Sequence, residues 1–113
     1  MARILPLTPV NVARAAQALR TGELVAFPTE TVYGLGADAP SDRATAAIFE
    51  AKGRPRFNPL ITHLPDLEAA RRIVELNPQG ERLAAKFWPG ALSLVARRRE
   101  DCGLSRLVSA GLA

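Results

Sequence analysis

Cationic side chains are concentrated in the stretch of residues 52–58. Lys52, Arg54 and Arg56 place three cations in seven residues, and Asn58 adds an amide. Arginine offers a planar fork of donors to phosphate oxygens, and lysine offers a mobile point charge. This stretch therefore suits a polyphosphate. The alternative is that Lys52 and Arg54 bind no ligand. Both lie at the end of an expected helix, where cations interact favourably with the helix dipole.

Hydroxyl groups and a carboxylate follow the apolar run 24–27. Thr29, Glu30, Thr31 and Tyr33 lie within five residues. Ligands of open α/β sheets bind where loops leave the ends of strands, so these groups would suit a small polar molecule. The alternative is that the threonines are ordinary turn residues and that Glu30 is a solvated carboxylate.

Other possible site residues give weaker signals. His63 is the only histidine, and its place in the apolar run 60–64 favours a hydrogen-bonded core residue. Gly34-Leu35-Gly36 lacks the third glycine of a dinucleotide-binding fingerprint, and no Walker A motif is present. Cys102 is the only cysteine, which excludes an internal disulfide and a cysteine-based metal cluster.

Helix signals and short apolar runs alternate along the chain. Capping residues and apolar spacing predict helices that begin at Thr8-Pro9, at Ser41 or Asp42, at Asp66 and at Asn77-Pro78. Glycine or proline is expected to end three of them, at Gly22, Gly53 and Pro89-Gly90. Apolar runs predict strands at 24–27, 60–64 and 91–96, with a turn over 29–36. This alternation indicates an α/β fold in which helices cover a sheet.

Composition and charge narrow the class of protein. The chain has 113 residues, of which 48% are hydrophobic and 23% charged, as expected for one globular domain or part of one. No apolar run approaches the ~20 residues that a membrane span needs, and no signal peptide is evident, so we expect a cytoplasmic protein. The net charge of +4 favours polyanionic partners. In Arg97-Arg98-Arg99, however, a solvated face is favoured over an RNA contact.

Three blocks, in order, resemble the YrdC/TsaC family. They are Phe27-Pro28-Thr29-Glu30-Thr31-Val32-Tyr33-Gly34-Leu35-Gly36, Ile48–Pro55 with Asn58-Pro59-Leu60-Ile61 and His63, and Phe87–Val95. The resemblance runs from about residue 6 to the end of the sequence. It implies that residues 1–113 are the N-terminal portion of a single domain with an open, twisted mixed sheet, helices packed on it and a positively charged cavity.

The resemblance also implies an activity. The family makes L-threonylcarbamoyl-adenylate from ATP, L-threonine and bicarbonate and releases pyrophosphate. A tRNA-modifying transferase complex then uses the product. The family's later T-x-x-x-R and S-x-N motifs have no counterpart before Ala113, so these residues alone are expected to be incomplete as a catalyst.

Site roles follow from the same resemblance. Lys52 and Arg54 would hold the triphosphate and stabilise charge during catalysis, and Asn58 would also bind ATP. Thr31 and His63 match threonine-binding positions, with Thr29 and Tyr33 shaping that pocket. Mg²⁺ would be bound mainly through the nucleotide, with no metal site of the protein's own.

Three alternatives stay open. The first is a non-catalytic RNA-binding module with weak contact to tRNA or other RNA, although single-strand readers usually offer more aromatic platforms. The second is a relative that forms a carbamoyl adenylate. The third is an assembly piece completed by another chain.

Overall fold

The computed structural model describes residues 3–55 and 59–110. The chain forms two compact units, Met1–Arg54 and Pro55–Ala113. In the described residues, no helix is both long and apolar enough to cross a bilayer.

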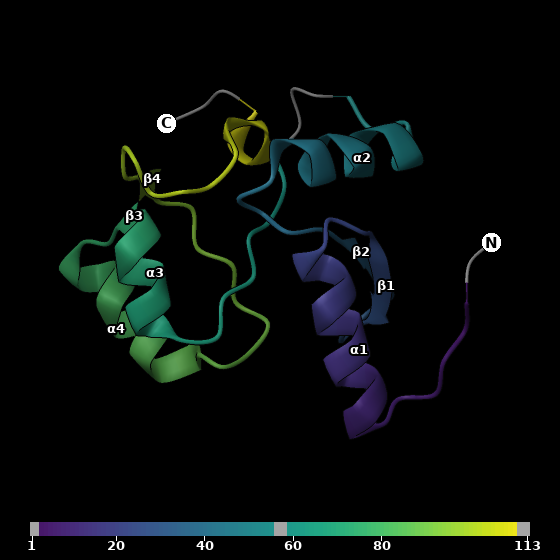
Figure 1. Cartoon of the computed structure of the whole chain (residues 1–113). Coiled ribbons are helices and arrows are strands. Elements are labelled where there is room, and N and C mark those ends of the chain that lie inside the picture. The colour runs from purple at the N-terminus through teal and green to yellow at the C-terminus, as the bar shows by residue number, and fades with distance from the viewer. Residues whose placement is uncertain (1–2, 56–58, 111–113) are drawn as a thin grey trace. The chain divides into compact units, whose positions relative to one another are not determined.

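The first unit begins with helix α1, Pro9–Arg20, whose start was predicted correctly. The Thr8 side chain accepts a hydrogen bond from Asn11 N at 3.2 Å, and Pro9 occupies the first turn, where its missing N–H costs nothing. Figure 1 shows α1 running alongside the hairpin that follows it. No residue of α1 is fully buried, so its expected apolar face is only partly covered.

The hairpin consists of β1, Val25–Pro28, and β2, Tyr33–Gly36, which pair antiparallel with Phe27 opposite Gly34. The prediction of a turn over all of 29–36 was wrong for its second half. Glycine has little intrinsic preference for strands, and β2 contains two glycines. The cross-strand packing of Phe27, described below, supplies the side-chain contact that these glycines lack.

Helix α2, Asp42–Lys52, is capped at both ends as predicted. Ser41 Oγ accepts from Ala44 N at 3.1 Å, and Gly53 ends the helix with a φ of 61°. Apolar spacing predicts an inward face of Ala44, Ala47, Ile48 and Ala51, and this prediction was partly wrong, because Ala51 is exposed. The buried face instead consists of Ala44, Thr45, Ile48 and Phe49.

The second unit is built on two packed helices, α3, Leu67–Ile73, and α4, Pro78–Phe87 (Figure 1). Asp66 and Asn77 cap them by accepting from the amide N–H three residues ahead, at 2.8 and 2.7 Å. Both starts were predicted from these residue types. Small buried residues, namely Ala69, Ala70 and Ala84, allow close packing in this unit.

Two predicted strands are absent from the described residues of this unit. Neither 60–64 nor 91–96 forms a ladder. The ladder found here joins β3, Val74–Glu75, to β4, Arg97–Arg98, antiparallel. Apolar runs suit strands, but a strand exists only where a partner satisfies its backbone. The α/β class is confirmed, and the described strands form two two-stranded antiparallel sheets.

The end of α4 is fixed by side-chain and backbone contacts. Trp88 Nε1 donates to the Leu92 carbonyl at 2.8 Å, so the indole is half-buried with its polar edge satisfied. A Cβ on Gly90 would lie 2.5 Å from the Phe87 carbonyl oxygen. Only glycine therefore fits at position 90 without moving the backbone. Beyond this loop, a short 3₁₀ helix, η1, spans Arg106–Ser109.

Candidate functional site

Thr29 organises the hydroxyl loop, which we define as residues 29–33. Its Oγ1 donates to the Val32 carbonyl, accepts from Thr31 N at 3.3 Å, and lies 3.4 Å from Thr31 Oγ1. This is the local turn chemistry expected of threonine. The hydroxyl of Thr29 is thus engaged inside the loop, and it holds Thr31 at a fixed place beside it.

The rest of the hydroxyl loop is open to solvent. Glu30, Thr31 and Tyr33 are all exposed, and Tyr33 lies at the start of β2, opposite Pro28. The loop therefore presents hydroxyls and a carboxylate from a hairpin whose strands fix its ends.

Gly34 and Gly36 have a packing role in this hairpin. A Cβ on Gly34 would lie 3.4 Å from Thr29 Cγ2, and a Cβ on Gly36 would lie 2.6 Å from Phe27 Cε1. The Phe27 ring thus lies across the backbone of β2. These contacts explain the two glycines without a nucleotide.

Lys52 and Arg54 lie at the C-terminal end of α2, where Gly53 reverses the chain. Gly53 N donates to the Glu50 carbonyl at 3.3 Å, and Arg54 N donates to the Phe49 carbonyl at 2.9 Å. This pair of bonds is the Schellman pattern, which needs a left-handed residue. Lys52 is exposed and Arg54 is half-buried. The capping geometry therefore fixes the point at which Arg54 leaves the helix.

The remaining predicted residues lie in or near the second unit. Asn58 and Arg56 lie outside the described residues. His63 is exposed, so the interpretation of it as a core histidine was wrong. Within the described part of the chain, residues 60–64 make a single backbone hydrogen bond, from Leu60 N to the Val108 carbonyl at 2.8 Å.

The structure brings together only some of the predicted residues. Thr29 and Thr31 are in contact, and Lys52 and Arg54 share one helix end in the same unit, whereas His63 belongs to the other unit. The described residues contain no group of three or more His, Cys, Asp or Glu side chains that could hold a metal ion.

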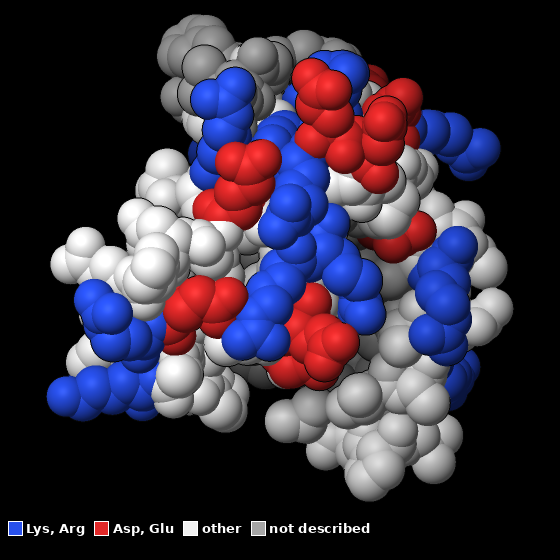
Figure 2. Space-filling model, turned by 90° about the vertical axis from the view of Figure 1, so that its left-hand side faces the viewer, with Lys and Arg blue, Asp and Glu red and all other residues white. Residues whose placement is uncertain are grey.

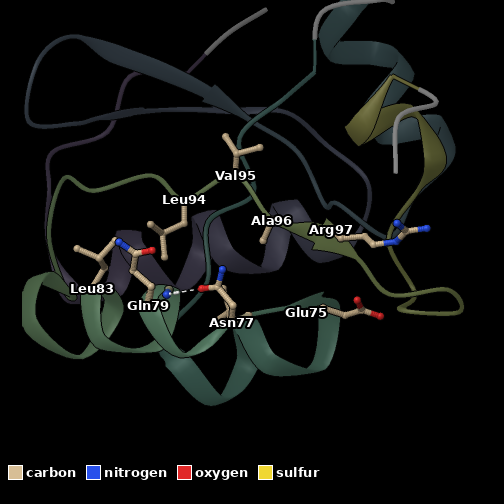
Figure 3. Close-up of a pocket in the computed structure, with 10 residues that line it drawn as sticks. Glu75, Asn77, Gln79, Leu83, Leu94, Val95, Ala96 and Arg97 are labelled. Carbon is tan, nitrogen blue, oxygen red and sulfur yellow. Dashed lines mark hydrogen bonds between the residues drawn. The ribbon is translucent and has the colours of Figure 1, made fainter.

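A hollow of about 370 Å³ lies in the second unit, and none of the predicted site residues lines it. Figure 3 shows Leu83 on α4 and Leu94 on the facing segment at one end, with Glu75 and Arg97 toward the other. Asn77 borders the hollow, but its side chain is engaged in capping α4.

The sequence did not reveal the role of Arg98. Its guanidinium donates to the carbonyls of Leu104 and Ser105 at 2.8 and 3.2 Å and to Ser109 Oγ at 2.7 Å. Arg99 Nε also donates to a protein group, the Arg71 carbonyl, at 2.7 Å. The prediction of a solvated arginine face was therefore wrong for Arg98. Only a three-residue basic run beside a glycine-containing turn could have hinted at this.

Figure 2 shows basic and acidic side chains side by side on one face of the molecule, with a run of basic side chains that acidic ones flank.

Comparison with known proteins identifies the family. The sequence model of the Sua5/YciO/YrdC family, described as "Telomere recombination", matches residues 17–113. The threonylcarbamoyl-AMP synthase of Bacillus subtilis is 49% identical over 103 residues, which are 90% of this chain and 30% of that protein. The enzyme of the same name from Pyrococcus abyssi is 50% identical over 99 residues, 87% of this chain and 28% of that protein.

Solved structures agree with the sequence comparisons. The crystal structure of P. abyssi Sua5 complexed with L-threonine matches 96% of this chain with a TM-score of 0.86 and 45% identity. A double variant of the same protein matches 94% with a TM-score of 0.88 and 46% identity. The chain spans about a third of each of these structures, 32%. With a family match over most of its length and relatives near 50% identity, the chain belongs to the Sua5/YciO/YrdC family.

Proposed function

We propose that the full-length protein is an L-threonylcarbamoyl-adenylate synthase that uses ATP, L-threonine and bicarbonate and releases pyrophosphate. The observation that carries this proposal is the match to the L-threonine complex of P. abyssi Sua5, at 45% identity over 96% of this chain. The relatives named threonylcarbamoyl-AMP synthase support the same reaction.

Threonine would be bound by Thr31 and His63, with Thr29 and Tyr33 shaping the pocket. Exposed hydroxyl and imidazole groups suit an amino acid that carries a hydroxyl, an amine and a carboxylate. Thr29 acts through Thr31, because its own hydroxyl is engaged in the loop.

ATP would be bound by Lys52, Arg54 and Asn58. The exposed ammonium of Lys52 and the guanidinium of Arg54 leave the same helix end and suit the triphosphate. Mg²⁺ would be held mainly by the phosphate oxygens of the nucleotide, because it keeps few protein ligands in sites of this kind.

The chemistry needs positioning and charge stabilisation more than a protein nucleophile. The threonine amine would take up carbon dioxide from bicarbonate to give a carbamate. A carbamate oxygen would then bond to the α-phosphorus while the bond from that phosphorus to pyrophosphate breaks. Lys52 and Arg54 would stabilise the negative charge that develops on the phosphoryl oxygens and on the leaving pyrophosphate.

The product is a mixed anhydride, which suits transfer of the threonylcarbamoyl group to a nucleophile. We propose that a tRNA-modifying transferase complex in the cytoplasm consumes it.

The test is pyrophosphate release by the full-length protein with ATP and bicarbonate, measured with and without L-threonine. We expect strict dependence on threonine, and Lys52→Ala should abolish most of the release. Lys86→Ala is the matched control, because Lys86 also lies in the last turn of a helix and is exposed. Release that ignores threonine and requires carbamoyl phosphate would instead identify a carbamoyl-adenylate enzyme.

A further inference from the structure

Arg98 lies at the centre of a hydrogen-bonded turn, residues 101–110, that has no part in the proposed chemistry. Three oxygen acceptors, the carbonyls of Leu104 and Ser105 and the hydroxyl of Ser109, surround its guanidinium at 2.7–3.2 Å. The Sγ of Cys102 is a fourth acceptor, 3.4 Å from Nη2 of Arg98. Because these acceptors come from four residues of one turn, a planar group with five donors can satisfy them together, and an ammonium cannot.

The backbone of this turn is strained, and the hydrogen bonds of Arg98 stabilise it. Asp101 and Ala110 have positive φ angles of 54° and 53°, which are unfavourable for residues other than glycine. Gly103 supplies a third left-handed position, with a φ of 87°. The hydrogen bonds of Arg98 and the burial of Ser105 and Val108 offset this backbone cost.

The turn is hydrogen-bonded to the segment of residues 60–64, which carries His63. The Val108 carbonyl accepts from Leu60 N at 2.8 Å, and no other backbone hydrogen bond of residues 60–64 is found within the described chain. This hydrogen bond ties the segment to the turn. His63 follows Leu60 by three residues.

We infer that Arg98 is a positioning residue for the threonine site: it fixes the turn whose Val108 carbonyl holds the segment bearing His63. This inference rests on the proposed function. The guanidinium of Arg98 is engaged within the turn, so its effect passes through Val108 and Leu60. Removing its guanidinium should therefore weaken threonine binding more than it alters the chemical step.

The test compares Arg98→Gln, Arg98→Lys and Arg97→Gln in the full-length protein. Arg97→Gln removes the same charge from the neighbouring residue, which is exposed and borders the hollow of Figure 3. We expect the threonine KM of Arg98→Gln to rise about tenfold, which corresponds to ~1.4 kcal/mol of binding free energy. Arg98→Lys should recover part of this loss, and Arg97→Gln should not differ from the unmodified protein.

Hydrogen exchange of the Leu60 amide supplies a second readout. Its protection should fall in Arg98→Gln and stay unchanged in Arg97→Gln. If Arg98→Gln has the same threonine KM as Arg97→Gln and only its kcat or thermal stability is lowered, Arg98 has a general stabilising role, and the inference is overturned. Unchanged protection of Leu60 would overturn it as well. Loss of threonine dependence in the unmodified protein would instead reject the proposed function, and the inference with it.

Discussion

The Phe27 ring lies so close to Gly36 that a Cβ at position 36 would approach Phe27 Cε1 to 2.6 Å. Phe27 and Gly36 lie on paired strands, with Phe27 directly opposite Gly34. The ring therefore lies over two glycines of β2 and covers backbone that their missing side chains leave open. This contact fixes the hairpin that carries the hydroxyl loop.

Gly36→Ala should destabilise the full-length protein by about 1–3 kcal/mol, the usual cost of overpacking. The φ of Gly36 is not in the left-handed region, so the backbone itself tolerates alanine. The cost arises because the added methyl group must displace the Phe27 ring. Urea unfolding measures the change in the free energy of unfolding.

Gly34→Ala is the control for this prediction. A Cβ there would meet Thr29 Cγ2 at 3.4 Å, an ordinary van der Waals distance, so a smaller effect is expected. Phe27→Leu should partly rescue Gly36→Ala in a double-mutant cycle. Equal losses for Gly34→Ala and Gly36→Ala would argue against the ring contact.

Gly53→Ala should cost about 1–2 kcal/mol, because alanine is strained at the φ of 61° that ends α2. Among the described residues, leaving aside its chain neighbours, no atom lies within 4 Å of the added Cβ, so the cost is conformational. Gly53→Asn should cost less, since asparagine tolerates left-handed backbone better. If asparagine proves no better than alanine in urea unfolding, the conformational explanation fails.

Arg54→Ala should weaken ATP binding by ~1.5–3 kcal/mol, the range for a hydrogen bond to a charged group. Isothermal titration of the full-length protein with ATP measures the change. Arg43→Ala removes the same charge from an exposed position at the start of the same helix and should leave the affinity unaltered. Equal ATP affinities for the two variants would remove Arg54 from the proposed site.

Thr29→Val should raise the threonine KM about fivefold, because one hydrogen bond contributes ~1 kcal/mol. Valine keeps the shape of threonine but removes the oxygen that accepts from Thr31 N at 3.3 Å. Thr29→Ser keeps that oxygen and should stay close to the unmodified protein. A normal KM in the valine variant would contradict the positioning of Thr31 by Thr29.

The stability contributed by Glu81 should disappear in acid. Its hydrogen bonds to the Arg71 guanidinium, 2.8 Å at the shortest, lower the pKa of Glu81 from its ordinary value of 4.5. A carboxylate with a lowered folded-state pKa stabilises the fold above the unfolded-state pKa, and this contribution is lost as the pH falls through the folded-state value.

Glu81→Gln should therefore lower the melting temperature at pH 7 and have no effect below the folded-state pKa of Glu81. The difference should be small and should shrink with added salt, because the Arg71 side chain is half-exposed. Arg71→Gln should give the same pH dependence, since it removes the other partner. If Glu81→Gln still lowers the melting temperature in strong acid, Glu81 acts through packing instead.

Local chemistry was sufficient to predict the helices. Thr8, Ser41, Asp66 and Asn77 each accept a hydrogen bond from a backbone amide three residues ahead, as their residue types predicted. Gly53 likewise ends α2 in the left-handed conformation. These interactions lie within one turn of chain, so sequence alone contains all their participants.

The family and the composition of the two candidate loops were also determined by the sequence. The three motif blocks predicted a family that the comparisons confirm. The nearness of Thr29 to Thr31 follows from their places in the four-residue loop between β1 and β2. The roles assigned to Lys52, Arg54, Asn58, Thr31 and His63 stay predictions.

Tertiary structure decided what depends on partners distant in the chain. Runs 60–64 and 91–96 look like strands, yet a strand needs a neighbour to satisfy its backbone, and β4 formed at Arg97–Arg98 instead. His63 is exposed although it lies in an apolar run, and Arg98 is engaged because a turn folds back around it. Burial and hydrogen-bond satisfaction are properties of a residue's surroundings, and only the folded chain brings those surroundings together.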